Sequence, residues 1–141
     1  MPLRIAFSIL AISLLSQLCV ADEPKSDKER IRGHWRVTSA RSHSEDIEVK
    51  YRVGTFTKDT LTVVGNGLAT VHKLTFRPNR MPKELDFEIT NGATAGQIIH
   101  AIYRIKDDKL TICMGTKRRP TAFSDDGEAI LLVLKRMAKP D

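Results

Sequence analysis

The sequence predicts an all-β domain, an antiparallel up-and-down barrel of about eight strands that follows a short helix. Three observations lead to this expectation. After residue 33 apolar side chains recur at every second position, the links between these stretches are short and rich in turn-forming residues, and no later segment carries a helical period. Eight strands suffice to close a small barrel without exposed edges. A β-sandwich is the alternative arrangement of the same strands.

The helix is predicted just before the first strand. Ser26 and Glu29 have the spacing of a capping box, in which each side chain binds the backbone of the other residue. Gly33 can end this helix. The expected organisation is therefore a leader with a short helix over residues 22–32 and a barrel domain over residues 33–138.

Period-two alternation marks the strands in turn. We expect them within 35–39, 47–53, 61–63, 74–76, 85–89, 99–105, 110–114 and 129–135. Between them lie sequences that favour turns, and Gly65-Asn66-Gly67 supplies the positive-φ residues of a tight hairpin.

The first 21 residues have the layout of a cleavable signal peptide. Arg4 forms a positive start, residues 5–15 are mostly apolar, and Ala21 is the small residue expected before the cleavage site. The apolar run is shorter than the ~20 residues of a membrane-spanning helix, so we expect no transmembrane anchor after processing. The prediction is export to the periplasm or the extracellular space, with cleavage after Ala21. Lipoprotein processing at Cys19 is an alternative, which the large Leu18 disfavours.

Removing residues 1–21 from the 141-residue chain leaves 120 residues, and the loss of Arg4 lowers the formal net charge of +6 to +5. Cys113 is then the one remaining cysteine, so an intramolecular disulfide is excluded and a buried, inert thiol is expected. The candidate surface contact is the basic cluster of Lys117, Arg118 and Arg119 beside Pro120. No stacking aromatic residues accompany it, so nucleic acid is not an expected partner.

Motifs for catalysis and cofactor binding do not occur in the sequence, so we expect no enzyme, no cofactor and no metal site. The paired acids at 107–108 and 125–126 fit turns, where their side chains bind the backbone. The histidines have no metal-site spacing; they are His34, His43, His72 and His100. A strand histidine as a haem ligand is the alternative, but His100 alternates with an apolar face and should point outward.

Tyr103 is the candidate polar residue of a ligand cavity. It is in phase with Ile99 and Ile105 and should therefore point into the barrel, where its hydroxyl needs a partner. That partner is either a ligand or a neighbouring strand. An eight-stranded barrel can be filled by its own side chains or leave room for one small ligand.

Gly33 and Trp35 form a Gly-x-Trp sequence at the start of the first strand, and Arg136 ends the last strand. This combination resembles the signature of lipocalins and related barrels, in which the tryptophan plugs one end and a basic residue packs across it. An arginine stacked on an indole contributes roughly 0.5–2 kcal/mol.

Nearly the whole mature chain is similar to a family of small lipocalin-like domains of uncharacterised function from planctomycete bacteria. The similar stretches are 33–40, 81–87, 101–105, 109–113, 119–124 and 131–136. His34 and Ala101 depart from the smaller residues usual there. The resemblance implies a lipocalin-like barrel and a bacterial source, and it implies no activity or site.

Two functions fit these expectations. The first is an exported lipocalin-like module that binds a small apolar or amphipathic molecule in the cell envelope. The alternative is a filled barrel that contacts an envelope protein or an anionic polymer through surface loops, in the manner of an inhibitor. A monomer is expected in both cases.

Overall fold

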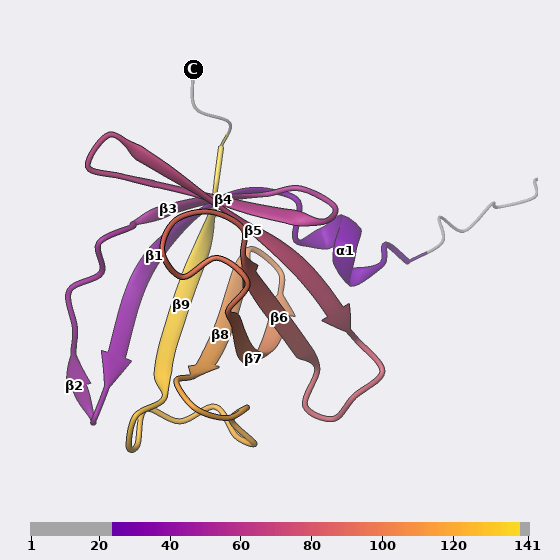
Figure 1. The fold of residues 1–141 in the computed structure, drawn as a ribbon. Coiled ribbons are helices and arrows are strands. Elements are labelled where there is room, and N and C mark those ends of the chain that lie inside the picture. The colour runs from indigo at the N-terminus through magenta and orange to yellow at the C-terminus, as the bar shows by residue number, and fades with distance from the viewer. Residues whose placement is uncertain (1–23, 139–141) are drawn as a thin grey trace, which may run out of the picture.

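The computed structural model describes residues 24–138 and has the predicted all-β architecture. Eight antiparallel strands close into a barrel and one extra strand, β2, extends it (Figure 1). The elements are α1 (Asp27–Arg30), β1 (Gly33–Ser42), β2 (Glu45–Asp46), β3 (Val53–Phe56), β4 (Thr60–Gly65), β5 (Leu68–Arg77), β6 (Glu84–Ile89), β7 (Ile98–Lys106), β8 (Lys109–Gly115) and β9 (Ile130–Met137).

The strands follow one another round the barrel in chain order, and the pairing of β1 with β9 closes it. In this closing ladder Trp35 lies opposite Arg136 and Ala40 lies opposite Leu132, with a shift of register between Val37 and Ser39. Every neighbouring pair is antiparallel, so short connections suffice. The prediction of an up-and-down barrel is confirmed, and the sandwich alternative is excluded.

The helix α1 lies at one end of the barrel, and β2 lies at the opposite end of β1 (Figure 1). Ser26 and Glu29 form the predicted capping box. The helix ends at Arg30 with Ile31 as its C-cap, two residues before Gly33, which instead begins β1.

The strand predicted over residues 47–53 is wrong for most of its length. Residues 47–52 are in no strand, and β3 begins only at Val53. Two backbone hydrogen bonds hold the segment against β1, from Ile47 N to the Ala40 carbonyl and from Val37 N to the Arg52 carbonyl. Its alternation is real, because residues 47, 49 and 51 are half-buried while 48, 50 and 52 are exposed. We call residues 47–52 the entrance segment.

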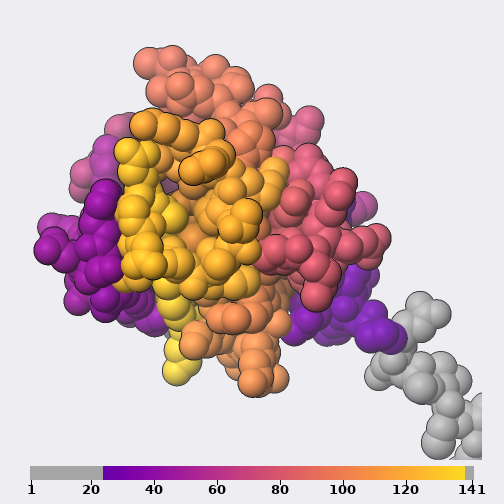
Figure 2. All heavy atoms as spheres, turned by 90° about the horizontal axis from the view of Figure 1, so that it is seen from below, coloured from indigo at the N-terminus to yellow at the C-terminus, as the bar shows by residue number. Residues whose placement is uncertain are grey.

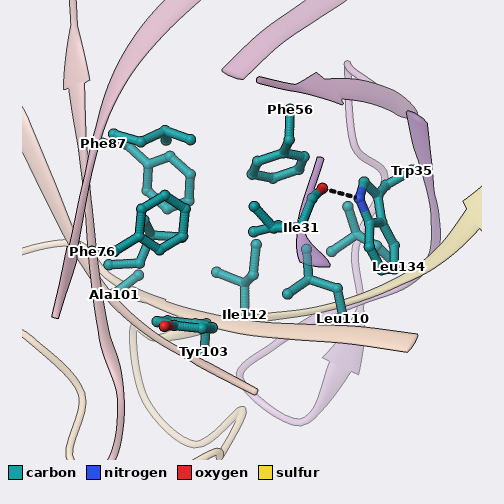
Figure 3. Close-up of a cluster of buried hydrophobic side chains, with 12 residues drawn as sticks. Ile31, Trp35, Phe56, Phe76, Phe87, Ala101, Tyr103, Leu110, Ile112 and Leu134 are labelled. Carbon is teal, nitrogen blue, oxygen red and sulfur yellow. Dashed lines mark hydrogen bonds between the residues drawn. The ribbon is translucent and has the colours of Figure 1, made fainter. Parts of the chain in front are cut away.

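The core fills the end of the barrel next to α1. Figure 3 shows apolar side chains from α1's C-cap and from the strands converging there. The cluster comprises Ile31, Trp35, Phe56, Leu74, Phe76, Leu85, Phe87, Ala101, Tyr103, Leu110, Ile112 and Leu134. Inward side chains farther along the barrel, such as Val37, Met114 and Leu132, are only partly buried because they border a cavity.

Candidate functional site

The predicted plug residues Gly33, Trp35 and Arg136 meet at the end of the barrel beside α1. Trp35 is fully buried, and its indole N–H donates a 2.7 Å hydrogen bond to the Ile31 carbonyl (Figure 3). The Arg136 guanidinium carbon lies 4.3 Å from the centre of the indole ring. The same guanidinium donates to the backbone carbonyls of Arg30 and Arg32. One stacked pair thus joins the first strand, the last strand and the helix.

Gly33 has a steric and a conformational role in the plug. Its φ of +121° lies in the region that favours glycine, and a Cβ there would lie 3.2 Å from Arg136 Nη1. A side chain at position 33 would therefore strain the backbone and press on the guanidinium that covers Trp35.

Tyr103 points inward as expected but does not line the cavity. It is 1% exposed, and its hydroxyl donates a 2.8 Å hydrogen bond to Oδ2 of Asp27 in α1. Lys83 Nζ lies 2.8 Å from the same oxygen. Burial alone would raise the pKa of Asp27, but the hydrogen bonds from Lys83 and Tyr103 outweigh it and hold that pKa below its ordinary value. Tyr103 thus anchors the helix, and its assignment as a cavity residue is corrected.

The basic cluster is divided between solvent and the barrel wall. Lys117 and Arg118 are exposed, and Lys117 lies 3.6 Å from Glu128. Arg119 instead turns to the barrel, where it donates 2.7 Å to Asp86 and 2.8 Å to the Ala101 carbonyl. The cluster is therefore not three free surface cations.

Asp86 is the centre of a charge network on the outer side of the barrel. Its two oxygens lie 2.7 Å from Arg77, 2.7 Å from Arg119 and 3.0 Å from His100 Nδ1. Burial would raise the pKa of this carboxyl, but these hydrogen bonds outweigh it and lower the pKa. His100 points outward, as the alternation of apolar and polar residues in its strand predicts. Arg119 belongs to the connection between β8 and β9, so its bonds hold this connection against the barrel wall. The connection covers the middle of the face seen in Figure 2.

Cys113 is fully buried, and its Sγ donates to the Ser124 carbonyl at 3.3 Å. Burial raises the pKa of this thiol, so the reactive thiolate is disfavoured.

The candidate site is a cavity of about 390 Å³ inside the barrel, between the packed core and the entrance segment. Its floor is formed by core side chains, including Phe56, Phe87 and Ile112. Its walls carry aliphatic side chains from six strands; they are Val37, Val53, Leu61, Val63, Ile99, Met114, Ile130, Leu132 and Leu134. These aliphatic walls would desolvate a charged group and suit hydrocarbon or aromatic groups.

The entrance segment forms one side of the cavity. Ile47, Val49 and Tyr51 line it, while Glu48 and Lys50 place charged groups at its rim. Tyr51 packs so closely on β4 that a Cβ added at Gly65 would clash with its ring. The Tyr51 ring can therefore pack in this place only because residue 65 is glycine. The Gly65-Asn66-Gly67 sequence thus affects both the hairpin turn and the wall of the cavity.

His72 is the polar side chain of the inner cavity wall. It lies on β5 opposite Leu61 and Ile89, and its ring meets the Phe87 ring edge to face at 6.4 Å between centres. Its Nδ1 is the single buried side-chain nitrogen or oxygen of the described residues that lacks a hydrogen-bond partner. Desolvation lowers the pKa of His72, so its imidazole is neutral at pH 7. Sequence reasoning missed this role, although His72 is in phase with Leu74 and Phe76.

No family model, curated protein or solved structure matches the chain. Within residues 24–138 no helix is long and apolar enough to cross a membrane. The same residues contain no group of three or more histidine, cysteine or acidic side chains placed to hold a metal ion.

The plug is tested by Trp35→Ala. We expect a loss of about 3–5 kcal/mol in the free energy of unfolding, because a large, fully buried side chain leaves a void. Chemical denaturation followed by circular dichroism measures it. Arg136→Met, which keeps the alkyl stem, should cost less. A loss below about 1 kcal/mol for Trp35→Ala would contradict the role of the plug.

The anchor of the helix is tested by Tyr103→Phe, with Tyr51→Phe at the cavity entrance as the matched control. Losing the hydrogen bond to a charged carboxylate should cost about 1.5–3 kcal/mol at pH 7, and the control should change little. The folded-state pKa of Asp27 is lowered, so its stabilisation is present above its ordinary value of 3.8 and is lost as the pH falls through the folded-state value. The cost should therefore shrink in acid. Denaturation at pH 7 and at a series of pH values below 3.8 checks both statements. Equal losses for the two variants at pH 7, or a cost of Tyr103→Phe that stays constant through the acid series, would refute them.

Proposed function

We propose that this protein is an exported, lipocalin-like binding module whose barrel holds a small apolar or amphipathic molecule. The observation that carries the proposal is the cavity of about 390 Å³, whose inner wall is apolar apart from His72. Its volume lies in the range of small-molecule sites, roughly 300–1,000 Å³.

The arrangement of the barrel supports the same function. The end beside α1 is sealed by the plug and packed with core side chains, whereas the hollow lies next to the entrance segment. Ligand pockets commonly lie in the mouths of β-barrels. The resemblance to small lipocalin-like bacterial domains and the signal-peptide pattern of residues 1–21 fit a carrier in the envelope or outside the cell.

The alternative, a filled barrel acting through its basic loop, has less support. The cavity contradicts a filled interior, and Arg119 is engaged with Asp86. Lys117 faces Glu128, so an acidic group accompanies the exposed cations.

Binding can be tested with N-phenyl-1-naphthylamine, an uncharged aromatic probe that fluoresces in apolar surroundings. The processed protein, freed of lipid by reverse-phase extraction and refolded, should bind it with a Kd on the order of 10 μM. Val63→Phe places a larger side chain in the cavity and should weaken binding at least roughly tenfold.

Val64→Phe is the matched control, because the neighbouring side chain is exposed on the outer surface. It should leave the Kd unchanged. If the probe does not bind to the wild-type protein, or if Val63→Phe and Val64→Phe both keep the wild-type Kd, the cavity is not a binding site and the carrier function is wrong.

Export is a separate prediction, and the residues concerned lie outside those that the structure describes. Expressed from residues 1–141 in a bacterium with two membranes, the protein should begin at Asp22 and appear outside the cytoplasm. Intact-mass measurement after fractionation gives the first residue. Ala21→Lys should block cleavage, and Cys19→Ala should not. An uncleaved cytoplasmic chain would refute export, and a diacylated Cys19 would show lipoprotein processing instead.

A further inference from the structure

His72 stands out because the other side chains of the inner cavity wall are apolar. The other polar side chains lining the cavity are Glu48, Lys50 and Tyr51, which belong to the entrance segment. Leu61 and Phe87 flank His72, and neither can accept or donate a conventional hydrogen bond. A polar ring in this position serves packing less well than a hydrocarbon of the same size.

The unpartnered Nδ1 has an energetic meaning. A buried polar group without a hydrogen bond destabilises a protein by about 1–3 kcal/mol. The folded barrel leaves this one atom unsatisfied within the described residues while satisfying the buried Tyr103 hydroxyl, the Trp35 indole and the Asp86 carboxylate. A ligand that supplies the missing hydrogen bond would remove this cost.

The chemistry of the ring defines what the ligand must offer. A neutral imidazole has one nitrogen that accepts and one that donates a hydrogen bond. His72 Nδ1 has almost no exposed area, so a ligand in the cavity reaches it only after the ring turns. A half-turn about Cβ–Cγ keeps the ring in the same volume and exchanges its nitrogen and carbon edges. The apolar walls would desolvate a carboxylate or an ammonium group, whereas a hydroxyl is uncharged and can donate to the imidazole.

We propose that His72 is the polar anchor of the cavity and that it selects apolar molecules carrying one hydroxyl group, such as phenols or long-chain alcohols. The inference rests on the proposed binding function and names the ligand class of the same cavity. The hydroxyl donates to an unprotonated ring nitrogen, and the hydrocarbon part packs against Val63, Ile99 and the core side chains below.

The test compares two probes of the same shape, 2-naphthol and 2-methylnaphthalene, which differ by a hydroxyl in place of a methyl group. Each displaces N-phenyl-1-naphthylamine from the wild-type protein and from His72→Phe. The preference is the Kd of 2-methylnaphthalene divided by the Kd of 2-naphthol. This ratio should fall about 5- to 10-fold in His72→Phe, because one hydrogen bond is lost. His34→Phe is the matched control, since His34 binds Thr55 and does not line the cavity. It should retain the wild-type preference.

The outcomes separate the two proposals. If both probes bind and the preference is the same in wild type and His72→Phe, the anchor is wrong and the carrier function stands. If neither probe displaces the dye or binds directly, both are wrong. Should His72→Phe fail to fold, the ¹⁵N chemical shifts of the wild-type His72 imidazole show whether the ring binds the hydroxyl group. A shift of the His72 nitrogens with 2-naphthol but not with 2-methylnaphthalene supports the anchor, and identical spectra overturn it.

Discussion

The stack of Arg136 on Trp35 determines how the rest of this barrel can be built. The two residues face each other in the ladder that joins the last strand to the first. Their hydrogen bonds reach the carbonyls of Ile31, Arg30 and Arg32, so the closure of the sheet and the position of the helix depend on one contact. Since Trp35 excludes water from this end, the neighbouring inward residues can form a dry core.

A core concentrated at one end leaves the opposite end free to be hollow. Tyr103, Phe76 and the C-cap Ile31 belong to the packed cluster, and the Phe76 and Tyr103 rings meet edge to face at 5.7 Å between centres. The cavity begins where this cluster ends. Apolar walls gain less from packing when they border a void, so the hollow carries a cost in stability that a bound apolar molecule would offset.

Much of the fold could be predicted because a barrel strand has the simplest of sequence patterns. Alternation identified the inward face even in residues 47–52, which make no ladder, because burial on one side produces the pattern without any pairing. The same segment shows the limit: alternation reports which side chains are buried and does not report where the backbone hydrogen bonds go. Gly54 obscured β3, since glycine contributes no side chain to the pattern.

The site was harder to predict because its decisive contacts are distant in sequence. The partner of Tyr103 is Asp27, 76 residues away, and that of Arg119 is Asp86, 33 residues away. No local spacing indicates either pair. The place of His72 was accessible in principle, because its position two residues before Leu74 puts it on the inward face. What the sequence could not show is that the side chains opposite and beside it, Leu61, Ile89 and Phe87, are all apolar.

The distribution of satisfied polar groups argues for function inside the barrel rather than on its surface. On the outer wall Asp86 is surrounded by two arginines and a histidine, and at the sealed end Tyr103, Trp35 and Arg136 all have partners. Such complete pairing is what structural polar groups require. The exception among the described residues is His72 Nδ1, and it belongs to a side chain on the wall of the apolar cavity. Because the other buried polar side chains of these residues have partners, the open hydrogen bond of His72 is the feature that supports a polar anchor for the proposed ligand.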